Sequence, residues 1–273
     1  MSVRPGDPPT ASASMARLQA YAQQTLAIAE VEFRKLRRDP TELFTRSVQP
    51  VLWLTVFGQV FGHVREIPTG GLSYLAYLAP GILAQSVLFV AIFYGIIVIW
   101  ERDLGLLQKQ LVTPAARSAL VLGKGLSAGL RGVAQAFIVY LVAFLMGVPL
   151  NLSFGAITLV LLFVVLGSAL FSTFSLLIAC LMKTRERFMG IGQVLTMPLF
   201  FASSAIYPLE MMPGWLKTVA VLNPLSYQVD ALRALMVKGG ASTFGLTVDF
   251  GLQLGLLILL VALAARMYPK VVL

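Results

Sequence analysis

Residues 132–182 read GVAQAFIVYLVAFLMGVPLNLSFGAITLVLLFVVLGSALFSTFSLLIACLM, and this stretch decides the fold class. None of its 51 residues is Asp, Glu, Lys or Arg. A helix needs about 20 apolar residues to cross about 30 Å of hydrocarbon, so the stretch is too long for one span. Turn-forming residues, Gly147, Pro149 and Asn151, lie near its middle. The stretch therefore predicts two membrane-spanning helices joined by a tight turn.

Similar uncharged stretches lie before and after this one. The longest of them has 34 residues, between Glu66 and Glu101. The expected membrane spans are 44–63, 73–100, 119–148, 153–182, 188–207 and 248–268. The sequence lacks the alternating segments of about ten residues that a transmembrane β-barrel would require. We therefore expect an all-α integral membrane protein in which residues 44–268 form six transmembrane helices.

The composition agrees with this class. Of 273 residues, 58% are hydrophobic and 12% are charged, whereas soluble domains carry about 45–50% apolar and about 25% charged residues. A water-soluble protein of this size has too little interior to bury so much apolar surface. The single cysteine, Cys180, excludes a disulfide-rich scaffold.

Positive charges lie mainly on one side of the expected membrane domain. Of 21 Lys and Arg residues, 17 fall in the N-terminal segment, residues 101–131, residues 183–187 and the C-terminal tail, and four fall in the other connections. Because cytoplasmic segments of membrane proteins are rich in Lys and Arg, both termini are expected in the cytoplasm, with the protein in the inner or plasma membrane. The net charge of +9 then reflects this topology and contact with anionic lipid, and it does not indicate binding of nucleic acid.

The segments outside the membrane domain are short. Residues 1–15 are rich in Pro, Ser and Ala and are expected to be disordered, and they lack the apolar core of a cleavable signal peptide. Residues 16–43 are expected to hold a helix in the cytoplasmic membrane interface, and residues 269–273 form a cytoplasmic tail. Near the end of that helix, basic and apolar residues fall on opposite faces: Phe33, Arg34, Lys35, Leu36 and Arg38. An ordinary basic patch beside the membrane is the alternative.

The second cytoplasmic segment, residues 101–117, reads ERDLGLLQKQLVTPAAR. Leu104, Leu107 and Leu111 recur at helical spacing, and Pro114 ends a helix at or before the preceding residue. A short amphipathic helix here, held between two long spans, would act as a lever that moves both spans together. A solvated connecting loop is the alternative.

The external residues 208–247 are too polar and broken to cross the membrane, but too apolar for a simple loop. Six apolar side chains would form one helical surface: Met211, Met212, Trp215, Leu216, Val219 and Leu222. After Asn223 and Pro224, a second helix is expected over residues 225–237. Non-spanning helices at membrane depth are tolerated where protein or a watery cavity surrounds them, so these helices are expected to cap the outer mouth of a pathway. Trp215 and Tyr227 also fit the alternative of simple interfacial anchors.

The sequence lacks the common patterns for metal binding and nucleotide binding. The G-x-x-x-x-G-K-[ST] and H-E-x-x-H patterns do not occur, and His63 is the single histidine. We therefore expect no enzyme activity, cofactor or metal in this chain. All twelve acidic residues are expected in loops or at span ends, whereas ion-coupled transporters place ionisable groups within the membrane. The sequence therefore favours transport driven by another chain. An ion-coupled secondary transporter or channel is the alternative, and a membrane-embedded enzyme is a further alternative.

Three G-x-x-x-G spacings, at 58–62, 125–129 and 251–255, permit close packing of helices. Six helices form a narrow bundle for a large amphiphile. We therefore expect a pathway between two copies of this chain, or between this chain and a related permease.

Two motifs carry a resemblance to a known family. The first is Glu101-Arg102 with Gly105, followed by LVTPAAR at 111–117, and the second is NPLSYQVDALR at 223–233. Together with six spans and a large external segment between the fifth and the sixth, they make residues 25–270 resemble an ABC-2-type transporter permease. The branch in question includes daunorubicin-resistance exporters and nodulation lipo-oligosaccharide exporters.

The resemblance implies a half-transporter. Two permease subunits would join two separate ATP-binding subunits, which bind ATP and Mg²⁺, and the complex would export drugs, lipids, glycolipids or polysaccharides. The residues implied to couple to the ATPase are Glu101, Arg102, Asp103, Gly105, Leu107, Leu111, Thr113, Pro114 and Arg117. A helix over residues 27–38 would be the connecting helix in the membrane interface, beside a coupling helix over residues 101–113.

The resemblance also implies external re-entrant helices over residues 209–237 that close the exit. The residues implied to form this external gate are Met211, Trp215, Asn223, Pro224, Tyr227, Asp230 and Arg233. From spacing alone, Asp230 and Arg233 stand at i and i+3 of a helix and could pair on its exposed side, either as part of the gate or in a purely structural role.

Overall fold

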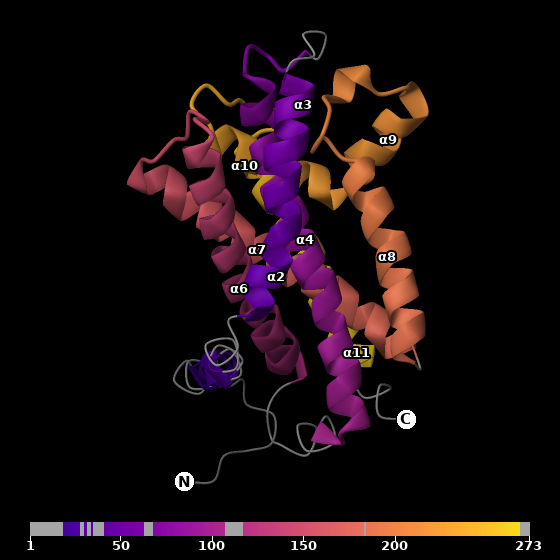
Figure 1. Cartoon of the computed structure of the whole chain (residues 1–273). Coiled ribbons are helices and arrows are strands. Elements are labelled where there is room, and N and C mark those ends of the chain that lie inside the picture. The colour runs from indigo at the N-terminus through magenta and orange to yellow at the C-terminus, as the bar shows by residue number, and fades with distance from the viewer. Residues whose placement is uncertain are drawn as a thin grey trace, which may run out of the picture.

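The computed structural model describes residues 19–27, 30–31, 34, 41–62, 68–106, 117–182 and 184–267. Its helices are α2 (Thr41–Leu52), η1 (Trp53–Phe57), α3 (Gly58–Gly62), α4 (Tyr74–Asp103), α6 (Arg117–Leu145), α7 (Phe154–Leu181), α8 (Arg185–Phe201), η2 (Leu209–Met211), α9 (Gly214–Leu222), α10 (Pro224–Met236) and α11 (Leu246–Met267). Within these residues, β structure is limited to one antiparallel bridge between Leu150 and Val237. The expected all-α class is confirmed (Figure 1).

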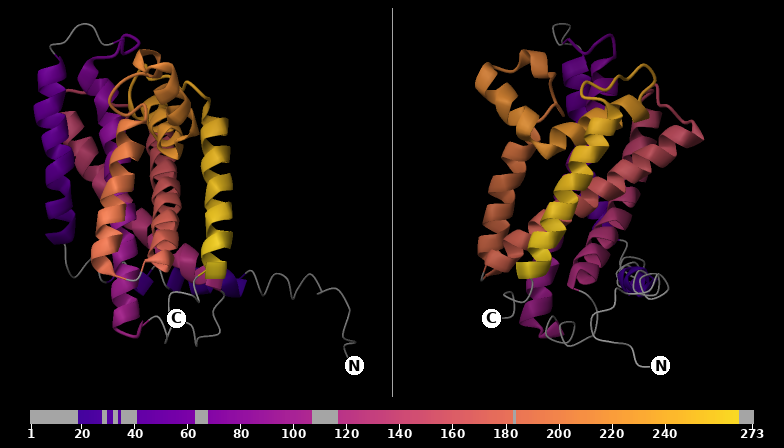
Figure 2. Two further views of the ribbon diagram at one scale, coloured as in Figure 1. Left: turned by 90° about the vertical axis from the view of Figure 1, so that its right-hand side faces the viewer. Right: turned by 180° about the vertical axis from the view of Figure 1, so that it is seen from behind.

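The long helices run side by side and define two ends of the molecule. Residues 19–27, the last turn of α4 and the end of α11 lie at one end, whereas α9 and α10 lie at the other (Figure 2). The helix formed by residues 19–27 lies across the first end of the bundle (Figure 2). We call the first end the base and the second end the cap.

Close contacts between α4, α6 and α7 form the centre of the bundle. A Cβ added at Gly125 would lie 3.4 Å from Cα of Ala169, and one added at Gly129 would lie 3.1 Å from Cγ1 of Val165. These glycines on α6 therefore let the α7 backbone approach closely, as small residues do between membrane helices. The G-x-x-x-G spacing at 125–129 thus serves packing within the chain.

The turn expected between α6 and α7 is confirmed. Gly147 has a φ of +78°, a left-handed conformation that favours glycine, and the N–H of Val148 donates to the carbonyl of Ala143 at 3.0 Å. The Ser153 hydroxyl then caps α7 by accepting the N–H of Ala156 at 3.4 Å.

Four of the six expected spans are single helices long and apolar enough to cross a membrane: α4, α6, α7 and α11. The expected span at 44–63 corresponds to α2, η1 and α3, which follow one another with helical backbone at both junctions. The π-helical turn η1 follows Pro50, which lacks the N–H that would continue the regular ladder of α2.

The expected span at 188–207 is shorter in the structure. α8 covers 17 residues and ends at Phe201. The side-chain amide of Asn223 donates to the carbonyl of Leu199 at 2.6 Å and to that of Ala202 at 3.0 Å. This contact satisfies carbonyls at the helix end, so the chain can leave the helix six residues earlier than expected.

Candidate functional site

The last turn of α4 contains a buried ion pair. Glu101 and Lys124 Nζ form a salt bridge, and their side chains are 6% and 4% exposed. Glu101, expected among the residues that couple to an ATPase, is thus buried against Lys124, which lies inside the expected span at 119–148. A buried charge needs a partner in a low-dielectric interior, and here α4 and α6 each supply one.

A second set of contacts ties the α4 end to the α7–α8 connection. The Arg102 guanidinium donates to the carbonyl of Met182 at 3.1 Å. Arg185 binds one Asp103 oxygen through Nη2 at 2.9 Å and Nε at 3.0 Å, and its guanidinium lies 4.6 Å from the ring centroid of Trp100. The base of α4 is thus held from both sides.

The expected helix over 101–113 does not begin at residue 101, and residues 107–113 lie outside the described residues. Residues 101–103 belong to α4 itself, and Gly105 follows with a φ of +68°, its N–H donating to the carbonyl of Arg102 at 2.9 Å. This glycine ends α4 as a left-handed helix terminus commonly does. Leu104 and Leu106 are exposed.

The structure describes only one of the five remaining residues that were expected to couple to the ATPase. Arg117, at the start of α6, is exposed. Leu107, Leu111, Thr113 and Pro114 lie outside the described residues.

The expected interfacial helix is described in part. Residues 19–27 are helical, and the exposed Arg34 binds Glu30 at 2.6 Å, one turn earlier. Phe33, Lys35, Leu36 and Arg38 lie outside the described residues.

At the other end of the bundle, α10 is buried rather than peripheral. It packs against α4, α7 and α11, and Gln228 Nε2 donates to the carbonyl of Phe163 at 3.0 Å. Asn223 is its N-cap, because the Asn223 side-chain oxygen accepts the N–H of Leu225 at 3.0 Å while Pro224 fills the first helical position. The Asn223-Pro224 motif therefore joins α10 to the end of α8.

Within the described residues, Asp230 and Arg233 are both buried and do not form the exposed pair that their spacing permits. Asp230 is 2% exposed and accepts the hydroxyl of Ser242 at 2.7 Å and the N–H groups of Thr243 and Phe244. Arg233 is 7% exposed, donates to the carbonyl of Ser204 at 2.6 Å and lies 3.7 Å from the ring centroid of Tyr77. Each of the two side chains thus hydrogen-bonds to a different part of the chain.

The remaining cap residues divide between the surface and the interior. Trp215 and Leu222 on α9 are 71% and 78% exposed, and Met211 is half-exposed. Tyr227 is buried and donates its hydroxyl to the carbonyl of Val221 at 2.8 Å, which joins α10 to α9.

Several buried ionisable groups escape the sequence reasoning. Arg131 lies within α6, where it donates to the hydroxyl of Ser127 at 2.8 Å and lies over the ring of Tyr94. Asp249, near the start of α11, is fully buried and lies 3.3 Å from the hydroxyl of Ser242. Asp249 lies in the first turn of α11, at a span end as expected, but it is buried there. For the buried basic groups the sequence holds a partial signal, since residues 117–131 carry three basic residues inside a stretch that is typical of one helix.

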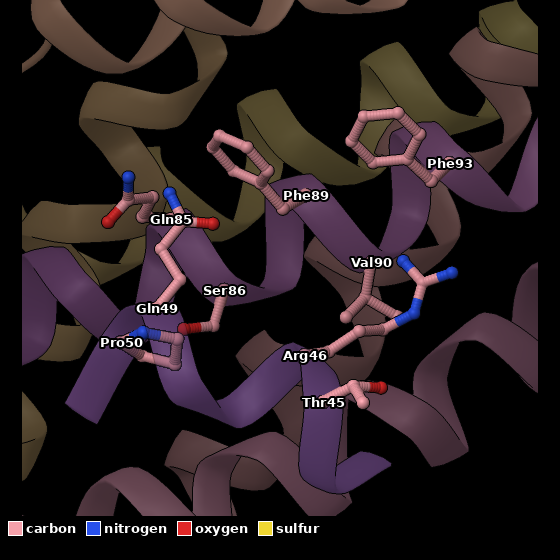
Figure 3. Close-up of a pocket in the computed structure, with 9 residues that line it drawn as sticks. All are labelled: Thr45, Arg46, Gln49, Pro50, Gln85, Ser86, Phe89, Val90 and Phe93. Carbon is pink, nitrogen blue, oxygen red and sulfur yellow. The ribbon is translucent and has the colours of Figure 1, made fainter. Parts of the chain in front are cut away.

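A pocket lies between α2 and α4. Its polar lining includes Arg46, Gln49 and Gln85, and its apolar lining includes Phe89 and Phe93, as Figure 3 shows. The cavity volume is about 170 Å³. Since one water molecule occupies about 30 Å³ in the liquid, the cavity has room for a small polar group. The sequence analysis did not single out any of the three polar residues as a site.

Comparisons with known proteins agree with this architecture. Residues 23–237 match the family described as ABC-2 type transporter. The chain is 30% identical to the putative transport permease ycf38 of Cyanophora paradoxa over 217 residues, which cover 79% of this chain and 74% of that protein.

Two bacterial proteins are also similar to this chain. The chain is 25% identical over 230 residues to the daunorubicin resistance ABC transporter permease protein DrrB1 of Streptomyces coeruleorubidus, covering 84% and 80% of the two chains. It is 26% identical over 197 residues to nodulation protein J of Rhizobium leguminosarum bv. trifolii, covering 71% and 74%. The chain therefore belongs to the ABC-2 type transporter family and is a multi-pass membrane permease subunit.

Proposed function

We propose that this chain is the membrane half of an ATP-driven exporter that moves an amphiphilic compound, a drug, lipid or glycolipid, out of the cytoplasm or the inner leaflet. Two permease subunits, identical or related, would assemble with two copies of a separate ATP-binding subunit, which binds ATP and Mg²⁺. The single observation that carries this proposal is the clamped end of α4 at the base, from which the chain passes through residues 107–116 into α6.

The proposed topology has six spans with both termini in the cytoplasm. α2, η1 and α3 together cover 22 residues, about 33 Å at 1.5 Å per residue, which suits the bilayer core. α8 covers about 25 Å by the same measure, and residues 202–208 continue from it toward the cap. The base then faces the cytoplasm, and α9 and α10 face outward as the external gate.

The proposed coupling uses the clamp as a lever. Force from the ATPase on residues 104–117 would reach α4 and α6 together, because Glu101 and Lys124 join the two helices. The exposed Leu104 and Leu106 are the described side chains suited to enter an ATPase groove. The ATPase shifts the permease between conformations to the extent that it binds one of them better.

Site-directed labelling tests the topology. Cys180→Ser removes the single cysteine, so Leu106→Cys and Trp215→Cys can then each be probed alone in intact cells. A membrane-impermeant maleimide should label the second variant, at the cap, and should label the first only after the cells are opened. Labelling of the Leu106→Cys variant in intact cells would overturn the topology.

Reconstitution tests the function. The permease and the ATPase encoded beside it should co-purify, and candidate amphiphiles should stimulate hydrolysis in proteoliposomes. Leu106→Asp should leave membrane insertion intact and abolish stimulation, with Trp215→Asp at the opposite end as the control. Uphill export by the permease without an ATPase would instead support a secondary transporter.

A further inference from the structure

The cap contains a pocket that the proposed function does not use. Its walls come from residues 68–72, the start of α4, the segment that joins α8 to η2, the end of α10 and the connection from α10 to α11. Thr69, Glu210 and Arg233 belong to its polar lining, the last of them on α10, which Figure 1 labels. The cavity volume is about 330 Å³, which leaves room for a phosphate or carboxylate group and part of the molecule that carries it.

Arg233 is the buried cation of this pocket. It is 7% exposed, its Nη2 donates to the carbonyl of Ser204, and its guanidinium lies over the ring of Tyr77. Neither of these partners carries a negative charge. Among the residues that the structure describes, Arg233 forms no salt bridge, and its Nε has no hydrogen-bond partner. Because a buried charge is costly unless it is paired, this cation calls for an anionic partner.

The carboxylates near Arg233 do not supply that partner. Asp230, one turn earlier on α10, accepts the hydroxyl of Ser242 and two backbone N–H groups. Glu210 is exposed on η2 and lines the same pocket. Both carboxylates act on Arg233 only at longer range, where they favour its charged form. The described part of the chain therefore keeps Arg233 charged without pairing it directly.

From this arrangement we infer that the cap pocket binds an oxyanion, a phosphate or carboxylate group, with Arg233 as its counter-charge. A guanidinium suits this task, because it remains charged and its N–H groups match the spacing of two oxyanion oxygens. A free anion and the head group of a lipid both carry such a group, and the test distinguishes these two sources. The site itself goes beyond the proposed function, and only its position on the outer side of the membrane rests on the proposed topology.

The test measures binding to the full-length permease in maltoside micelles, which contain no phosphate, by titration calorimetry. Inorganic phosphate probes the free anion, and dioctanoyl phosphatidic acid probes the head group, with dioctanoylglycerol as its uncharged match. The wild-type protein should bind at least one of the two phosphates and should not bind dioctanoylglycerol. Arg233→Gln should weaken that binding about tenfold or more, because a charge-assisted contact is lost. Arg233→Lys, which keeps the charge without the fork of N–H groups, should give an intermediate affinity.

Two exposed positions test the pocket without disturbing the contact between Arg233 and Ser204. Ala241 is exposed and lines the pocket, so Ala241→Trp should block binding in a folded protein, whereas Ala241→Ser, which changes the volume little, should not. Glu210→Gln removes a negative charge from the pocket lining and should tighten binding about threefold, as is typical of an exposed charge.

A matched control separates the site from general charge effects. Lys217→Gln removes an exposed positive charge from α9, also in the cap but outside the pocket lining, and should leave binding unchanged. Equal affinities in the Arg233→Gln and Lys217→Gln variants would overturn the inference. So would undiminished binding by a folded Ala241→Trp variant, or a wild-type protein that binds neither phosphate. These measurements use neither ATP nor an ATPase, so failure of the proposed export in reconstitution would leave them unchanged, and loss of this site would leave the reconstitution test unchanged.

Discussion

Removing one partner of the Glu101–Lys124 pair should cost more stability than removing both. The two side chains are 6% and 4% exposed, so Lys124→Met removes the positive charge that faces the buried Glu101 carboxylate. Such a change costs about 3–5 kcal/mol in proteins. Replacing both groups, as in Glu101→Leu with Lys124→Met, removes the desolvation penalty together with the attraction and should restore stability to within about 1 kcal/mol of the wild type.

The assay is a double-mutant cycle on the purified permease. Unfolding in mixed micelles with increasing denaturant gives the free energies of the wild type, both single variants and the double variant, and the cycle should return a coupling of about 2 kcal/mol or more. The matched control is the Asp103–Arg185 pair, whose side chains are 35% and 39% exposed. It should contribute about 1 kcal/mol or less.

The same variants separate stability from coupling. The double variant should fold but hydrolyse ATP with less export per ATP than the wild type, because α4 and α6 are no longer joined at the base. A coupling energy for Glu101–Lys124 no larger than that of the Asp103–Arg185 control would refute the buried pair. Unchanged export per ATP in the double variant would refute its role as a lever.

Three other substitutions test particular contacts. Asn223→Ala removes the α10 cap and the contacts to the end of α8, and should lower the free energy of unfolding by about 2 kcal/mol. Asn151→Ala, which removes one side-chain contact to the N–H of Ser153, is the control, and equal losses would contradict the proposed link between α10 and α8. Gly81→Ala would place a Cβ 2.2 Å from a backbone carbonyl oxygen and should cost about 1–3 kcal/mol, whereas Gly190→Ala meets open space and should be neutral or stabilising in the same unfolding assay. Gly105→Ala should cost about 1 kcal/mol by the same measure because of its left-handed backbone, and no loss would show that this turn readjusts freely.

Much of the fold can be predicted because it depends on local sequence. The turn at Gly147 and the helices on either side follow from run length and turn residues, and the structure agrees within a few residues. The end of α8 could not be predicted in this way. It depends on the Asn223 side chain, 21–24 residues further along, reaching back to two carbonyls.

The functional groups were harder to predict than the helices. Glu101-Arg102-Asp103 reads as a charged cytoplasmic turn, whereas the structure places all three residues in the last turn of α4, with Asp103 exposed. Glu101 differs because α4 continues through these residues and turns that one side chain inward, toward Lys124. Asp230 was placed at the surface for a similar reason, since its partners are backbone N–H groups 13 and 14 residues away that only the folded chain brings near.

α4 connects the clamp at the base to the cap through a single helix of 30 residues, about 45 Å long. At its cap end, the Tyr77 hydroxyl donates to the carbonyl of Ser204 at 3.0 Å, and Gly81 lies against Ala205. The same Ser204 carbonyl accepts from Arg233 of α10. A displacement of the α4 base along its axis would therefore act directly on the segment that joins α8 to the cap, because a continuous helix resists shortening. Coupling through α4 requires only that these contacts persist while the cap moves, and Tyr77→Phe, which deletes one of them, should reduce export per ATP without changing ATP binding.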